Sequence, residues 1–158
     1  MPDLARAGVL ESMPGFRRKD PRIRTLTYRH ADAIRPAGRP FVVQRFTSDQ
    51  AGRPAPPDFA PFVSRALAWA FPQSAVFQEP RPDNGPKIRI QGRIDLFHRF
   101  GSQGLRVEIS ACVLEVSCDE ETVLWLGAKK ADWIRRYSTD DCLLLLADDF
   151  VATWTAEV

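Results

Sequence analysis

The fold of this chain is decided by residues 86–136, which read PKIRIQGRIDLFHRFGSQGLRVEISACVLEVSCDEETVLWLGAKKADWIRR. Apolar and polar residues alternate through its first part, where Ile88, Ile90 and Ile94 fall in one row. Successive side chains of a strand point to opposite faces, so this alternation predicts a strand with one buried face. We expect strands at 87–100, 105–118 and 122–136, separated by short polar breaks of hairpin length. The stretch therefore predicts an antiparallel meander.

Two amphipathic helices are expected to cover one face of this meander. In Asp58–Phe71 apolar residues recur at intervals of three and four. A second apolar stripe follows Ser138 in Thr139–Val158, and serine is a common helix cap. The predicted class is α+β, a two-layer sandwich with a mostly antiparallel sheet in the order β-α-β-β-β-β-α and both helices on one face. Shorter elements are expected as strands at Phe41–Phe46, Ala75–Gln78 and Ile23–Tyr28 and a short helix at Asp3–Ser12.

Length and charge predict one domain with a distinct N-terminal segment. The 158 residues carry a net charge of +2, which argues against a nucleic-acid partner. Residues 1–40 hold nine Arg or Lys against four acids, whereas the remainder holds thirteen against sixteen. We divide the chain into residues 1–39, a basic, Pro-rich and partly extended segment, and residues 40–158, a single α+β domain. A basic tether beside an acidic membrane surface is the alternative interpretation of the first segment.

No stretch reaches the ~20 apolar residues of a membrane helix, and no secretory signal is visible. We therefore expect either a cytosolic protein or a mature form whose export segment is missing. The three cysteines lack the spacing of a zinc site, so we expect no metal and no cofactor. Cys112 is expected to be a buried small hydrophobe. Whether Cys118 and Cys142 form a disulfide is left open.

The sequence offers no recognisable catalytic set. The acidic pairs 140–141 and 148–149 occupy adjacent helix positions about 100° apart, which is a poor arrangement for sharing one substrate proton. Helix-start and surface roles account for them. His98 is in phase with the inward row of its strand but has no identifiable partner acid. We therefore expect a protein that is not an enzyme. Gly92 in mid-strand indicates a bulge or the close approach of a helix.

Six residues are candidates for a surface that contacts a partner protein or lipid: Trp69, Phe97, Phe100, Trp133, Arg89 and Arg93. The two tryptophans fall outside, or at the edge of, the expected buried rows, and the two phenylalanines cluster near the first hairpin. The arginines are expected on the face opposite the helices. Trp, Phe and Arg are enriched at interfaces. Scattered apolar residues and a solvated basic face are the alternative interpretation.

The order of elements resembles that of small periplasmic lipoproteins of Gram-negative envelopes. Most similar are the ABC-type transport auxiliary lipoproteins that accompany MCE lipid-transport systems; LPS-assembly and curli-secretion-type lipoproteins are more distant. The resemblance covers about residues 40–158, and its segments are Phe41–Phe46, the helix opening DFAPFVSRAL at Asp58, Ile88–Phe97, Glu121–Trp125 and Asp141–Trp154. The chain has no lipobox or N-terminal cysteine to lipidate, and Arg45 and Phe46 stand where the family's strand ends in proline.

The resemblance implies a non-catalytic accessory of an envelope transport system that docks to transport proteins, with lipid as a further candidate ligand. It implies a location in the periplasm or at the inner leaflet of the outer membrane if an export signal has been removed, and membrane association if a lipidated cysteine lies upstream. The alternative is a cytosolic α+β protein-interaction module that assembles through an open sheet edge. A third is an enzyme of unrecognised class. The partner and the oligomeric state are left open.

Overall fold

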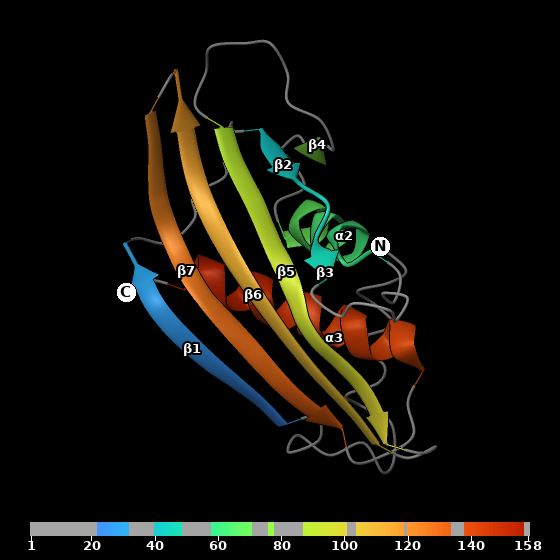
Figure 1. Cartoon of the computed structure of the whole chain (residues 1–158). Helices are drawn as coiled ribbons and strands as arrows, with labels where there is room; N and C mark the ends of the chain where they lie inside the picture. The colour runs from blue at the N-terminus through green and yellow to red at the C-terminus, as the bar shows by residue number, and fades with distance from the viewer. Residues whose placement is uncertain are drawn as a thin grey trace.

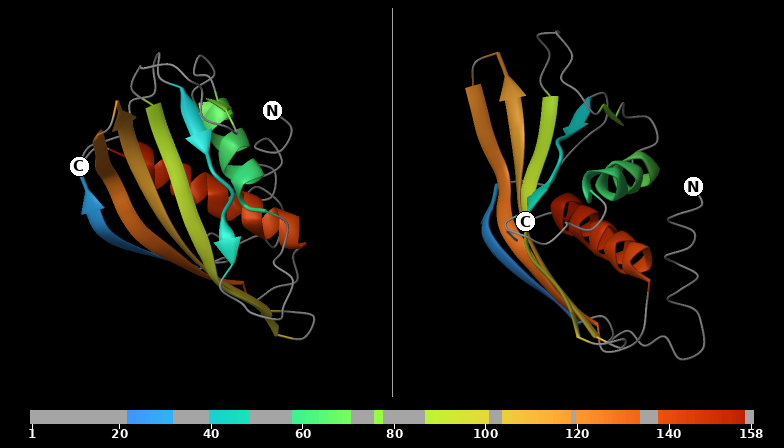
Figure 2. Two further views of the ribbon diagram at one scale, coloured as in Figure 1. Left: turned by 45° about the horizontal axis from the view of Figure 1, so that its top comes forward. Right: turned by 45° about the vertical axis from the view of Figure 1, so that its right-hand side comes forward.

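In the computed structural model, two helices cover one face of a mixed sheet (Figure 1). The structure describes residues 22–31, 40–48, 58–70, 76–77, 87–100, 104–118, 120–133 and 138–156. The helices α2 (Ala60–Ala70) and α3 (Thr139–Thr155) lie on the same side of the sheet, as the right-hand view of Figure 2 shows. The expected two-layer α+β sandwich is confirmed. The helix expected at Asp3–Ser12 lies outside the described residues.

The sheet has the strand order β1-β7-β6-β5-β2-β4, and β3 also pairs with β5. Its antiparallel part consists of β5, β6, β7 and β1, whereas β2 and β3 run parallel to β5 and β4 runs parallel to β2. The strand bounds are β1 Arg22–His30, β2 Phe41–Val43, β3 Thr47–Ser48, β4 Val76–Phe77, β5 Lys87–Phe100, β6 Gly104–Ser117 and β7 Glu120–Trp133.

The three long strands agree with the predicted meander, with β6 and β7 beginning slightly earlier than expected. The strand expected at 23–28 is longer and forms one edge of the sheet by pairing with β7. The expected division at residue 40 therefore falls between β1 and β2, two strands of the same sheet.

The strand expected at 41–46 ends at Val43, and β3 follows only after Phe46, whose side chain is buried in the core. Its ring lies against Gly92 of β5, where an added methyl group would overlap both the ring and the Ser110 carbonyl oxygen. Gly92 therefore marks the close approach of Phe46 rather than of a helix. Asp58 fixes this turn, since its Oδ1 accepts hydrogen bonds from the backbone N–H of Phe46 (3.3 Å) and of Ala60 at the start of α2 (3.0 Å).

Helix α3 begins where its sequence predicts. The Ser138 hydroxyl caps the helix by accepting a hydrogen bond from the backbone N–H of Asp141 (3.1 Å). Aromatic rings then join the helix to the sheet. The Trp125 ring of β7 lies 6.0 Å from the rings of both Phe150 and Trp154, which are 5.2 Å from each other. Pairs at these separations add to the stability that burial of their area provides.

A bulge at Asp95 interrupts the alternation of β5. The register with β6 shifts between Ile94 and Leu96, so one residue is extra. One inserted residue moves every following side chain to the other face. Phe97 consequently packs against the core, while Leu96 and His98 lie on the opposite face. The expectation that Leu96 and His98 continue the inward row of the strand is therefore wrong.

Lys129 of β7 is a charged side chain within the core, with no exposed surface. Its Nζ donates hydrogen bonds to Thr25 Oγ1 of β1 (2.6 Å) and Thr153 Oγ1 of α3 (2.7 Å). It also lies 2.6 Å from Asp149 Oδ2 and 5.5 Å from the centroid of the Phe150 ring. Burial of an ammonium group is tolerated because these partners replace its water. One side chain thus joins β1, β7 and α3.

We predict an unequal effect of removing the two members of this ion pair. The Asp149 side chain is 40% exposed whereas that of Lys129 is 1% exposed. Asp149→Ala leaves a buried, uncompensated ammonium group and is expected to lower the free energy of unfolding by about 3 kcal/mol. Lys129→Met keeps the buried volume and lets Asp149 hydrate, so a change within about 1 kcal/mol is expected. Urea denaturation of both variants measures the difference, and an equal or reversed order contradicts this account.

Candidate functional site: the outer face of the sheet

The face of the sheet opposite the helices is here called the outer face. Side chains on it are identified by the register, because directly paired residues of adjacent strands point to the same side. Four rows cross it from β1 through β7 and β6 to β5. The rows are Arg22, Asp132, Arg106 and His98; Arg24, Lys130, Glu108 and Leu96; Leu26, Ala128, Ser110 and Arg93; and Arg29, Leu126, Cys112 and Gln91.

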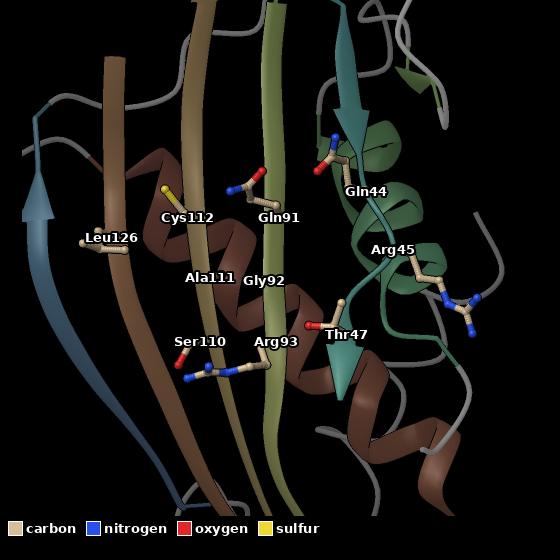
Figure 3. A pocket seen from close by; sticks show the side chains of 10 residues that line it. All are labelled: Gln44, Arg45, Thr47, Gln91, Gly92, Arg93, Ser110, Ala111, Cys112 and Leu126. Atoms are coloured by element: carbon tan, nitrogen blue, oxygen red, sulfur yellow. The ribbon is translucent and has the colours of Figure 1, made fainter. Parts of the chain in front are cut away.

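A hollow of about 390 Å³ lies on this face, between β7 and the segment that links β2 and β3 (Figure 3). It is lined by Gln44, Arg45, Thr47, Gln91, Gly92, Arg93, Ser110, Ala111, Cys112 and Leu126. The break between β2 and β3 creates one wall, because it brings Gln44 and Thr47 beside β5. Arg45 points away from the hollow in Figure 3 and pairs with Asp58 at 3.6 Å. The interior thus offers amide and hydroxyl groups beside an apolar wall.

Ion pairs between strands neutralise much of the charge on the outer face. Arg106 Nε lies 2.7 Å from Asp132, which raises the pKa of the guanidinium through a hydrogen bond and opposite charge. Lys130 pairs with Glu108 at 3.3 Å. Arg89 pairs with Glu121 across β6. Exposed pairs of this kind stabilise little, but they fix where the charges stand.

The Asp95 bulge organises the polar side of the hollow. Its carboxylate accepts one hydrogen bond from Arg93 Nε (2.6 Å) and another from the Ser110 hydroxyl (2.5 Å). Charge-assisted hydrogen bonds of this kind hold both donors in defined positions. The guanidinium and the hydroxyl therefore stand side by side at one end of the hollow, as Figure 3 shows.

Exposed apolar side chains gather at the other side of the hollow. Leu26 of β1 is 42% exposed and Leu126 of β7 is 41% exposed, and Ala128 lies between them in the register. Tyr28, at the bulge of β1, is 71% exposed. These residues include three of the four large hydrophobic side chains that are exposed in the described part of the chain. Leu126 also lines the hollow, so the apolar surface is continuous with it.

The six residues that the sequence predicts as a contact surface do not lie together in the structure. Arg89 and Arg93 lie on the outer face, each in an ion pair. Trp69 is 52% exposed on α2, in the helix layer. Phe97 packs against the core, and the Phe100 side chain lies outside what the structure describes. The sixth, Trp133, is buried in the core rather than at the edge of the buried rows.

The remaining chemical groups do not converge on the hollow. His98 lies in the row beyond Arg106 and Asp132, at the far end of β5. The acids at 140, 141, 148 and 149 all belong to α3, on the other side of the sheet. No disulfide joins any two of the three cysteines. Within the described residues, no cluster of three or more His, Cys, Asp or Glu has the arrangement of a metal site, and neither helix is long and apolar enough to span a membrane.

Sequence reasoning missed the residues that best define the outer face. Leu26 and Leu126 are not among the predicted contact residues, because the pairing of β1 with β7, which brings them onto one face, is not evident from the sequence. The alternation of β7 places Trp125, Lys129 and Trp133 on one face, and that phase is the signal that would have found both the buried lysine and the exposed Leu126.

No protein-family model and no curated protein matches this chain. Two solved structures of PelC from Paraburkholderia phytofirmans, both described as dodecamers, are similar in fold. The first, a point variant, has a TM-score of 0.64 and 13% sequence identity, covering 86% of this chain and 98% of that chain. The second has a TM-score of 0.63 and 10% identity, covering 87% and 99%. At such identity the likeness shows a shared fold.

We predict three distinct reactivities for the cysteine thiols. Cys118 is exposed and is expected to be alkylated first by iodoacetamide. Burial raises the pKa of the Cys112 thiol, so its alkylation should be slower at neutral pH and should keep accelerating as the pH rises above the ordinary thiol value. Cys142 is buried and should react only after unfolding. Peptide mass spectrometry over a pH series measures all three, and equal rates for Cys112 and Cys118 at pH 7 would refute the assignment.

Proposed function

We propose that this chain is a non-catalytic accessory component of a cell-envelope transport assembly, and that it docks to proteins of that assembly through the outer face. One observation carries the proposal. The helices cover only one face of the sheet, and the other presents an apolar surface beside a polar hollow. An uncovered face of this composition is typical of a surface that binds another protein.

The arrangement of groups on the outer face supports a protein partner. The cores of protein interfaces are apolar and their rims polar. Here Leu26 and Leu126 form the apolar part of the surface, with the paired charges of Arg106 and Lys130 on one side and the Gln91 amide on the other. Both amide and hydroxyl groups in the hollow are able to satisfy hydrogen bonds of a partner backbone.

A role in binding is also favoured over catalysis by the state of the one thiol in the hollow. A nucleophilic cysteine is activated by a lowered pKa, and burial shifts the pKa of Cys112 the other way. No described histidine lines the hollow. We therefore propose no reaction for this face.

Two likenesses support the proposal. The element order resembles that of auxiliary lipoproteins of envelope transport systems, which implies an envelope location and transport proteins as partners. The fold is shared with PelC, whose two solved structures are described as dodecamers, and this supports docking to other protein subunits. The alternative is a cytosolic interaction module of the same architecture, which assembles through an open sheet edge. In either case the partner is a protein and not a nucleic acid.

The proposal is tested by crosslinking inside cells that express the gene with its own upstream sequence. A photoreactive amino acid at Leu126 should give adducts with envelope transport proteins, and the protein should fractionate with the envelope. The same amino acid at Ala152, exposed on α3, is the matched control and should give none of these adducts. Adducts only with cytosolic proteins would support the alternative, and identical adducts from both positions would refute docking through the outer face.

We further predict that Leu126→Arg lowers co-purification of the partner at least tenfold, because it places an unpaired charge in the apolar part of the interface. A tenfold loss corresponds to about 1.4 kcal/mol of binding free energy. Leu126 is already largely exposed, so the free energy of unfolding should change by less than about 0.5 kcal/mol. Trp69→Arg provides the comparison on the helix layer. If that change alone abolished co-purification, the docking surface would lie on α2.

A further inference from the structure

The free edge of β1 is a second candidate interaction surface, at the border of the outer face. β1 pairs with β7 on one side, and no described strand lies on its other side (Figure 1). Seven of its nine residues are exposed, Ile23 and His30 being the exceptions. A strand edge of this length presents a row of unpaired backbone groups to any extended chain.

The orientation of the backbone identifies the available groups. The Leu26 carbonyl oxygen lies against Gly127 of β7, so Leu26 faces its partner strand. Adjacent residues of a strand direct their N–H and C=O groups to opposite sides. Thr25 and Thr27 therefore direct theirs to the open side. These are the groups through which an added strand forms its ladder.

The charge of β1 determines which chain fits. The strand contains Arg22, Arg24 and Arg29 and no acid. Among the ion pairs of the described residues, none involves these three arginines. Arg24 borders a hollow of about 260 Å³ in which Arg106 and Lys130 are already paired with Asp132 and Glu108. Within the described part of the chain, the edge therefore carries positive charge that no acid neutralises.

This charge excludes a second copy of β1 as the natural occupant. Two β1 strands side by side would bring six arginines together, and edge charges of this kind are a known defence against self-pairing. The same charges attract a strand of opposite sign, because complementary charge favours encounter and fixes register.

We propose that β1 binds an extended acidic segment of a partner protein as an additional strand of the sheet. Outward side chains recur every second residue, so acidic residues stand beside Arg22 and Arg24 and an apolar residue stands beside Leu26. A partner segment that runs parallel to β1 therefore has acidic residues at its first and third positions and an apolar residue at its fifth. A segment that runs antiparallel has the same residues in the reverse order. The inference deepens the proposed function by naming the chemistry of a partner segment, and its test with synthetic peptides is independent of the cellular location.

The experiment measures fluorescence anisotropy of labelled peptides with the full-length protein. Two probes alternate Glu and Val. One carries Leu at its C-terminal end, to fit a parallel strand, and the other carries Leu at its N-terminal end, to fit an antiparallel strand. In the matched control of each probe, Lys replaces Glu. We expect one Glu probe to bind at least ten times more tightly than its Lys control, with an affinity that falls as NaCl is raised. Equal affinity for the two, or no binding of either Glu probe at millimolar protein, would overturn the proposal.

Two sets of variants separate the backbone from the charge. Thr27→Pro removes an outward N–H and should abolish binding, whereas Thr27→Val keeps the N–H and should retain it. Arg22→Glu with Arg24→Glu should lower the affinity at least tenfold, whereas Arg65→Glu on the exposed side of α2 should not. Circular dichroism verifies folding of each variant, and the charge variants remain informative if Thr27→Pro fails to fold. If peptide binding survives both sets of changes, the site is not at the β1 edge. Such a result would leave the crosslinking test at Leu126, and with it the proposed function, unaffected.

Discussion

The buried ammonium group of Lys129 is the contact that joins β1, β7 and α3, and it sets their relative positions more than their stability. It holds β1 through Thr25 and α3 through Thr153 and Asp149, from a strand between them. A buried charge tolerates little displacement, because every partner it loses leaves an unsatisfied group. These contacts hold α3 over one face of β7 and hold β1 beside β7. Because α3 lies on that face of the sheet, the outer face is left uncovered by the helices.

Much of the fold follows from alternation, and the departures have local causes. The meander and both helices were predicted because their apolar periods are long and regular. The bulge at Asp95 was not, since a single inserted residue leaves the composition of the strand unchanged. The split between β2 and β3 was also missed, because Phe46 reads as one more strand residue until the space above Gly92 is known. Both features depend on contacts between distant parts of the chain.

The candidate site was predicted less completely than the fold. Arg89 and Arg93 were correctly assigned to the face opposite the helices by the phase of β5. The aromatic candidates illustrate the limit of composition. Trp133 shares a residue type with Trp69, yet Trp133 is buried in the core whereas Trp69 is 52% exposed. Residue type indicates what an interface favours, whereas the phase of the strand or helix decides whether the side chain reaches it.

The two borders of the sheet are unlike each other. One is the nine-residue β1, and the other ends in the two-residue β4 beside the interrupted β2 and β3. A chain that joined the long border would find no equivalent template at the short one, because a strand of two residues offers almost no ladder. Growth of the sheet is thus favoured at one border only. Because a copy of this molecule offers one long border instead of two, copies cannot extend the sheet on both sides, which disfavours open-ended polymerisation.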